Sequence, residues 1–244
     1  MDAVINIVRR ELAAYFATPV AYVFIVIFLA LASALTFYLG GFYERNTADL
    51  QAFFGFHPWL YLFLVPSISM RLWAEERKAG TIELLLTLPV TLWQAVLGKF
   101  LAAWLFIGAA LMLTFPMWLT VNYLGDPDNG AILAGYLGSW LMAGGFLAIG
   151  ACLSAVTRNQ VVAFILSVVV CFGFLISGHP MILNAFRLLA PQFIVDGVAN
   201  LSFYGHFGSI SKGVIGLADL GYFVLVIGFW LVANMIVLEM KKAD

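Results

Sequence analysis

The amino-acid sequence predicts an all-α integral membrane protein with six transmembrane helices. The chain of 244 residues is 64% hydrophobic and 10% charged, whereas soluble domains are about half apolar and about a quarter charged. Six segments are apolar over the ~20 residues that a helix needs to cross the hydrocarbon core. The other apolar stretches are too short to span, so we expect them to lie along the membrane surfaces.

The predicted spans are residues 20–40, 53–72, 92–121, 131–156, 161–177 and 220–238. The first is expected to be a true span rather than a cleaved signal peptide. A long segment containing Glu11 precedes it, and its apolar run exceeds the core of a signal peptide. All six belong to one transmembrane domain, residues 1–244.

The placement of Lys and Arg predicts the orientation, because cytoplasmic loops carry an excess of both. With the N-terminus inside, nine of the 12 Lys and Arg residues are cytoplasmic and three are outside. The outer three are Arg45, Arg187 and Lys212. Since the number of spans is even, both termini are expected in the cytoplasm.

Residues 1–18 are predicted to form an amphipathic helix in the cytoplasmic interface. Its apolar stripe recurs at helical spacing and consists of Val4, Ile7, Val8, Leu12 and Tyr15. Arg9 and Arg10 fall away from that stripe. Pro19 then separates this helix from the first span. The alternative is a polar leader that contributes only a positively charged pair.

Residues 178–218 are predicted to form a helical hairpin on the outer face. "PMILNAFRLLA" and "PQFIVDGVANL" begin with Pro180 and Pro191, a favourable first-turn residue, and each is too short to span. Arg187 and Asp196 are expected near the hairpin surface. We expect a re-entrant or lid-like element, because irregular backbone at membrane depth needs protein or a cavity to cover it.

No catalytic pattern occurs in the sequence. It contains no H-E-x-x-H, no G-x-S-x-G and no P-loop. His57, His179 and His206 are expected on the outer side in separate segments, which favours ordinary interfacial roles over a metal site. Cys152 and Cys171 are expected to be buried small hydrophobes. The chain is therefore predicted to have no catalytic residue, cofactor, metal or nucleic-acid surface.

The predicted spans are almost free of ionisable groups, which ion-coupled transporters place at membrane depth. Lys99 is expected to snorkel toward the interface. The fourth span carries a row of small residues, namely Gly135, Ser139, Ala143, Gly144, Ala148 and Cys152. Such rows let helices approach closely, either within one subunit or across a dimer. An energy source outside the chain is therefore expected.

Residues 73–91, the inner loop between the second and third spans, carry the densest charge cluster: Glu75, Glu76, Arg77 and Lys78. "AEERKA" is predicted to form a short helix that ends at Gly80. Residues 82–88 are expected along the interface, with Glu83 toward water. Thr91 and Gln94 form a T-x-x-Q capping box for the next span. The alternative is a loop that only sets topology, although such loops need no acidic residues.

Three stretches resemble one known family. "EERKAGTIELLLTLPV" resembles the first cytoplasmic loop of ABC-2-type permeases, the membrane subunits of ATP-binding-cassette exporters. "ELAAYFATPVAYVF" and "HFGSISKGVIGLADLGYF" resemble the gliding-motility-type branch of that family. The sequence departs from the branch at Gly216, where the branch has an acidic residue. The three stretches lie near the start, middle and end of the chain.

The resemblance implies a single ABC-2 permease domain with a type V exporter-like fold in the bacterial inner membrane. It implies a homodimer, or a pair with a close paralogue, that binds two copies of an ABC ATPase, in which the ATP and Mg reside. Membrane lipid and a periplasmic accessory protein are further expected partners. The chain itself would be a transport subunit rather than an enzyme.

The resemblance also assigns roles to residues. The coupling helix, seated in a cleft of the ATPase, would contain Glu75, Glu76, Arg77, Lys78, Gly80, Thr81 and Glu83. Secondary ATPase contacts would be Arg9, Arg10, Glu11 and Arg158. The outer gate would contain Pro180, Arg187, Pro191 and Asp196.

The implied mechanism is alternating access, in which closure of the ATPase pair moves the coupling helices and opens a path outward. One alternative is a mechanotransmission complex that acts on a periplasmic partner without transport. Another is a stand-alone intramembrane enzyme, against which the lack of clustered catalytic groups argues.

Overall fold

The computed structural model describes residues 2–80, 90–189 and 191–241. The structure is 83% helix, and the described residues contain no strand. The elements in chain order are α1 (Asp2–Phe16), α2 (Pro19–Ala34), the π-helix η1 (Leu35–Leu39), α3 (Gln51–Ser69), α4 (Arg71–Ala79), α6 (Leu92–Met112), α7 (Phe115–Leu124), α8 (Asn129–Val156), α9 (Gln160–Ile176), α10 (Pro180–Leu189), α11 (Gln192–Asn200), α12 (Phe203–Ile210) and α13 (Leu217–Met240).

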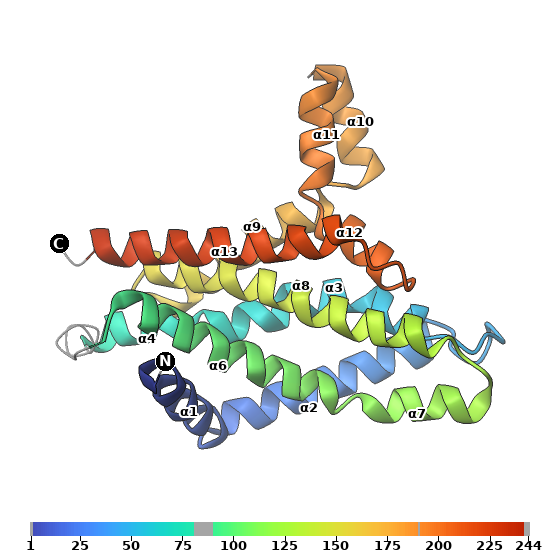
Figure 1. The fold of residues 1–244 in the computed structure, drawn as a ribbon, viewed down its shortest axis with the longest axis horizontal. Helices are drawn as coiled ribbons and strands as arrows, with labels where there is room; N and C mark the ends of the chain where they lie inside the picture. Colours follow the sequence, from blue (N-terminus) through green and yellow to red (C-terminus); the bar gives the residue numbers. More distant parts are fainter. Residues whose placement is uncertain (1, 81–89, 190, 242–244) are drawn as a thin grey trace.

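Five helical runs among the described residues are long and apolar enough to cross a membrane: Pro19–Leu39, Gln51–Ala79, Leu92–Leu124, Asn129–Val156 and Leu217–Met240. They define a multi-pass membrane protein. The remaining predicted span corresponds to α9, a shorter apolar helix of 17 residues. The long helices run side by side along the longest axis of the molecule (Figure 1).

The predicted third span, 92–121, is not one continuous helix. It divides into α6 and α7 at Leu113 and Thr114, just before Pro116. Proline lacks the N–H that an unbroken helix would use, and its ring clashes with the preceding turn. The hydroxyl and the backbone N–H of Thr114 both donate to the carbonyl of Leu111, at 2.6 and 3.0 Å, where α6 ends.

Helix α8 is the centre of the bundle and packs against α3, α4, α6, α9, α12 and α13. All six members of the predicted small-residue row are buried. A Cβ added at Gly135 would lie 2.4 Å from Cε2 of Phe54 in α3, and one at Gly144 would lie 2.9 Å from Nε1 of Trp104 in α6. The row therefore serves packing within one subunit, which decides between the two alternatives.

Helix α3 is irregular in composition, because it contains Pro58 and Pro66. Between them Tyr61 is fully buried, and its hydroxyl lies 2.8 Å from Oγ of Ser139 in α8. His57 lies 2.7 Å from the same oxygen through Nδ1. The expectation that His57 is an interfacial residue is wrong, since it is fully buried among the rings of Phe28, Phe53 and Phe54.

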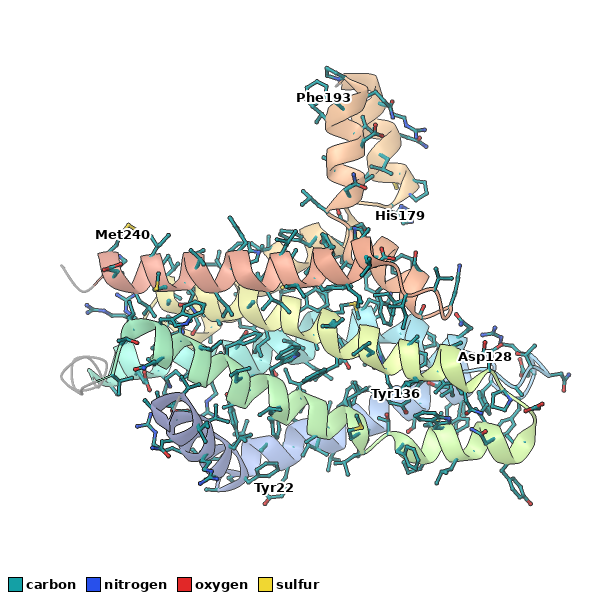
Figure 2. All side chains as sticks on the ribbon, in the orientation of Figure 1. Tyr22, Asp128, Tyr136, His179, Phe193 and Met240 are labelled. Carbon is teal, nitrogen blue, oxygen red and sulfur yellow. The ribbon has the colours of Figure 1, made fainter. Side chains whose placement is uncertain are left out.

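The two helices of the predicted hairpin are present as α10 and α11, which pack on each other. It extends away from the long bundle helices, with Phe193 near its tip and His179 at its base (Figures 1 and 2). At the base, Nδ1 of His206 lies 2.6 Å from Asp219 and Nε2 lies 3.0 Å from the carbonyl of Asn200. Tyr222 donates to the carbonyl of Leu201 at 2.5 Å. These bonds tie the end of α11 to α12 and α13.

Substitution of Gly135 by Ala should destabilise the bundle, because the new methyl group overlaps the buried Phe54 ring. Overpacking of this kind costs about 1–3 kcal/mol. The matched control is Gly173→Ala in α9, where an added Cβ meets no atom within 4 Å. Thermal unfolding in detergent should show a lower midpoint for Gly135→Ala only; equal midpoints for the two variants would contradict the close approach of α3 and α8.

Candidate functional site

Helix α4 is the predicted short charged helix, and it continues directly from α3. It ends at Gly80, whose φ of +72° is the left-handed conformation of a helix C-cap. Leu72, Trp73 and Ala74 are buried against the bundle. Glu75 is exposed on the other side, as are Lys78 and the final residues. One side of α4 is thus fixed in the protein and the other is available to a partner.

A serine of α8 fastens the start of α4. Oγ of Ser154 accepts the N–H groups of Trp73 and Ala74, each at 3.1 Å, and donates to the carbonyl of Met70 at 2.9 Å. Backbone N–H groups in the first turn of a helix have no partner within the helix, so a hydroxyl that accepts two of them replaces a cap. The Arg77 guanidinium also donates to the carbonyl of Ala155. Movement of α4 is thereby linked to the end of α8.

Lys99 joins α4 to α1 and α6. Its ammonium group lies 2.7 Å from a carboxylate oxygen of Glu76 and 3.3 Å from one of Glu11, and 5.3 Å from the centre of the Trp73 ring. Lys99 is only 4% exposed, so the expectation that it snorkels to the interface is wrong. A buried charge is tolerated only where opposite charges are close, and three separate helices supply this cluster.

A second layer of charges lies outside this cluster. Arg71 and Glu75 pair at 2.9 Å one turn apart on α4, and Arg10 pairs with Glu11 at 2.9 Å. Exposed pairs of this kind contribute little to stability. Burial by itself would raise the pKa of Glu11, but Lys99 and Arg10 together hold that pKa below its ordinary value.

A cavity of about 280 Å³ opens between α1, α2, α4 and α6. Its polar end is formed by the charged residues of the two layers, namely Glu11, Arg71, Glu75, Glu76 and Lys99. Its apolar end includes Tyr15, whose ring stacks on Phe106, and Phe24, whose ring is tilted against Phe106. The cavity therefore lies directly beside the charged cluster that joins α1, α4 and α6.

The structure divides the predicted coupling residues. Glu75 and Lys78 are exposed, Glu76 faces inward to Lys99, and Arg77 binds the end of α8. Thr81 and Glu83 lie outside the described residues, as does the predicted interfacial segment 82–88. The Thr91–Gln94 capping box is confirmed, since both of its reciprocal bonds are present at the start of α6.

The remaining predicted contacts lie in two places. Arg9 and Arg158 are exposed, Arg9 on α1 and Arg158 in the turn between α8 and α9. The predicted gate residues all lie on the hairpin. Pro180 begins α10 and Pro191 precedes α11. Arg187 is exposed, and Asp196 accepts a hydrogen bond from Gln192 at 2.9 Å. The described residues contain no group of three or more His, Cys, Asp and Glu that could hold a metal.

The fold and this site define a class, that of multi-pass membrane proteins with a charged helix offered at one end of the bundle. Comparison with known families gives the identity within that class: the model for the ABC-2 family transporter protein matches residues 60–204, which is 145 of the 244 residues. The chain belongs to the ABC-2 transporter family. It is a membrane permease subunit of an ABC transporter, and the family implies association with an ABC ATPase. No curated protein matches the chain.

Replacement of Lys99 by Met should destabilise the protein, because Glu11 and Glu76 would lose their shared cation. Removal of one partner from a buried ion pair costs about 3 kcal/mol or more. The control is Arg71→Gln, which breaks only an exposed pair. Thermal unfolding should show a large loss for Lys99→Met, recovered when Glu11→Gln and Glu76→Gln are added. Failure of that triple variant to recover would show that the packing of the lysine stem matters more than its charge.

Stability should also fall in acid. The native pKa of Glu11 is lowered, so its ion pairs stabilise the fold above the ordinary Glu pKa of about 4.3. That contribution is lost as the pH falls from there through the lower native value. Unfolding midpoints measured across this range should decline less steeply in Glu11→Gln than in the wild type. Parallel profiles would mean that the pairs of Glu11 contribute nothing.

Proposed function

We propose that this permease couples ATP hydrolysis in a separate ATPase subunit to the movement of a substrate across the bacterial inner membrane. The working complex contains two permease copies, as a homodimer or with a close paralogue, and two ATPase copies that hold the ATP and Mg. In this proposal α9 is the fifth of six spans, so both termini lie on the same side, and the excess of Lys and Arg there supports the cytoplasm. Catalysis resides in the ATPase, and this chain transmits its motion.

The observation that carries the proposal is the two-sided character of α4. Its exposed side presents Glu75 and Lys78, charges of opposite sign that a protein cleft can pair. Its buried side is bonded to Ser154 of α8 and, through Glu76, to Lys99 of α6. A displacement imposed on α4 by the ATPase therefore acts on two spans and on α1 together. A loop that only sets topology needs none of these bonds.

Secondary ATPase contacts are proposed for α1 and for the turn after α8. Arg10 and Glu11 stand beside the α4 cluster, and Arg158 is exposed next to the end of α8. Thr81 and Glu83 complete the proposed coupling element. Arg9 was grouped with these contacts on sequence grounds, but it lines a different surface of α1.

The hairpin of α10 and α11 is proposed as the outer gate of this permease. Its base is bonded to α12 and α13 through His206 and Tyr222, and α12 packs on the central helix α8. Motion of the bundle thus has a bonded route to the hairpin. The resemblance to the gliding-motility-type branch supports a periplasmic accessory protein as a further partner of this outer element.

Charge reversal on the exposed side of α4 tests the coupling role. Glu75→Lys and Lys78→Glu should each reduce ATPase capture by the purified permease by about tenfold, which is the scale of one lost charged contact at an interface. The control is Glu44→Lys in the exposed segment after η1, at the opposite end of the bundle. Capture of the co-expressed ATPase and stimulation of its ATP hydrolysis are the measurements.

Two outcomes would decide against parts of the proposal. Normal ATPase capture by both α4 variants would show that α4 is not part of the contact with the ATPase. Normal capture and hydrolysis with no transport of any candidate substrate in proteoliposomes, together with altered binding of a periplasmic partner, would instead favour mechanotransmission.

A further inference from the structure

A second groove lies on another surface of α1, where it meets α6 and the middle of α8. It has a volume of about 410 Å³, and its lining is apolar except at one residue. Val4 and Val8 of α1 line it together with Leu101 and Leu105 of α6. The indoles of Trp104 and Trp140 complete the apolar lining, to which Arg9 contributes almost only the aliphatic part of its side chain.

The indoles of Trp104 and Trp140 stack on each other, and each donates a hydrogen bond to the backbone of the other. Their rings stack with centroids 4.2 Å apart and planes at 13°. Nε1 of Trp104 donates to the carbonyl of Trp140 at 2.8 Å, and Nε1 of Trp140 donates to that of Trp104 at 3.2 Å. Since both N–H groups are satisfied inside the protein, the rings offer the groove only carbon surface. A ligand in this part of the groove has to be apolar.

Arg9 differs from its neighbour Arg10. The Arg10 guanidinium is bound to Glu11 at 2.9 Å, whereas Arg9 forms no ion pair with any residue in 2–80, 90–189 or 191–241. No carboxylate lines the groove. The groove is therefore a long apolar surface, and one of the residues that line it carries a guanidinium without an ion pair, a combination that an anionic amphiphile complements.

We propose that this groove binds an anionic phospholipid of the cytoplasmic leaflet, with its phosphate on Arg9 and an acyl chain along Leu101, Leu105 and the indole pair. A guanidinium matches phosphate with two parallel hydrogen bonds, and the anionic lipids of this leaflet attract basic groups near the membrane. A free phosphate would leave the apolar lining uncovered. This inference rests on the proposed function in one respect: the choice of the cytoplasmic leaflet follows from the proposed cytoplasmic position of α1.

The proposal gives Arg9 a lipid role in place of the ATPase contact. It also gives α1 two different anchors. On one side Glu11 is bound to Lys99, and on the other a lipid joins Arg9 to the surface of α6. The lipid would therefore contribute to the position of the same helix that borders α4.

The test uses the full-length permease in phosphatidylcholine vesicles that contain a minor fraction of phosphatidylglycerol. Bromine atoms on the acyl chains of one lipid at a time quench nearby tryptophans, and the quenching that disappears in Trp104→Phe reports the groove. We expect brominated phosphatidylglycerol to occupy the groove about fivefold more than an equal fraction of brominated phosphatidylcholine, which corresponds to about 1 kcal/mol. Native mass spectrometry of retained lipid provides a second measurement if Trp104→Phe does not fold.

The matched variants are Arg9→Gln and Arg10→Gln, which remove the same charge from adjacent positions of one helix. The preference should disappear in Arg9→Gln and persist in Arg10→Gln. Equal loss in both would indicate attraction to general surface charge and overturn the site, as would a preference retained in Arg9→Gln or absent from the wild type. Loss of ATPase capture by Arg9→Gln in lipid-free detergent would show that Arg9 contacts the ATPase and would overturn the lipid site. A negative result in the charge-reversal experiment on α4 would not change the lipid measurement.

Discussion

The close approach of other helices to α8 is the constraint on which the rest of the structure depends. Lipid tails are as apolar as leucine side chains, so helices in a bilayer gain little from the hydrophobic effect and depend on packing and interhelical hydrogen bonds. Glycines and alanines on α8 permit that packing, and its Ser139 and Ser154 supply hydrogen bonds to α3 and to α4. The charged helix and the base of the hairpin both take their positions from this one helix.

The Lys99 cluster shows why a charge is retained inside an otherwise apolar bundle. An ion pair replaced by apolar residues of similar volume is often neutral or stabilising, so stability alone does not account for it. The cluster instead makes the positions of α1 and α4 depend on each other, because Glu11 and Glu76 both bind the ammonium group of Lys99. Such mutual dependence suits two elements that face the same partner.

Much of the fold could be predicted because apolar length and local capping act within a short stretch of sequence. Five of the six predicted spans, the two hairpin helices, the Gly80 stop and the Thr91–Gln94 capping box all follow from neighbouring residues. The break at Thr114 was missed although Pro116 was visible, because the apolar run continues on both sides of it. The burial of His57 was missed because its position was inferred from the end of a span rather than from its neighbours.

The candidate site was only partly predictable. The exposure of Glu75 and Lys78 follows from the amphipathic pattern of α4, but the partners of Lys99 come from residues 88 and 23 positions away along the chain. No local pattern encodes such pairing. The sequence did contain one signal for this pairing. Lys99 stands inside an apolar span, and Glu11 and Glu76 stand in two segments that were expected at the same membrane surface. Arg9, the charged residue at the lipid groove, could not be told apart from its neighbour Arg10 in the sequence.

The two prolines of α3 have a consequence for how motion passes along the molecule. Pro58 and Pro66 each leave one backbone carbonyl without its helical N–H partner. These are two positions, about 12 Å apart, at which α3 can bend. Between them, Tyr61 is fastened to α8 through Ser139. A bend at Pro66 would displace the end of α3 that continues into α4, and a bend at Pro58 would displace the end that begins at Gln51. The segment between the prolines is thus held against α8, and any bend of α3 is expected at Pro58 or Pro66 rather than between them.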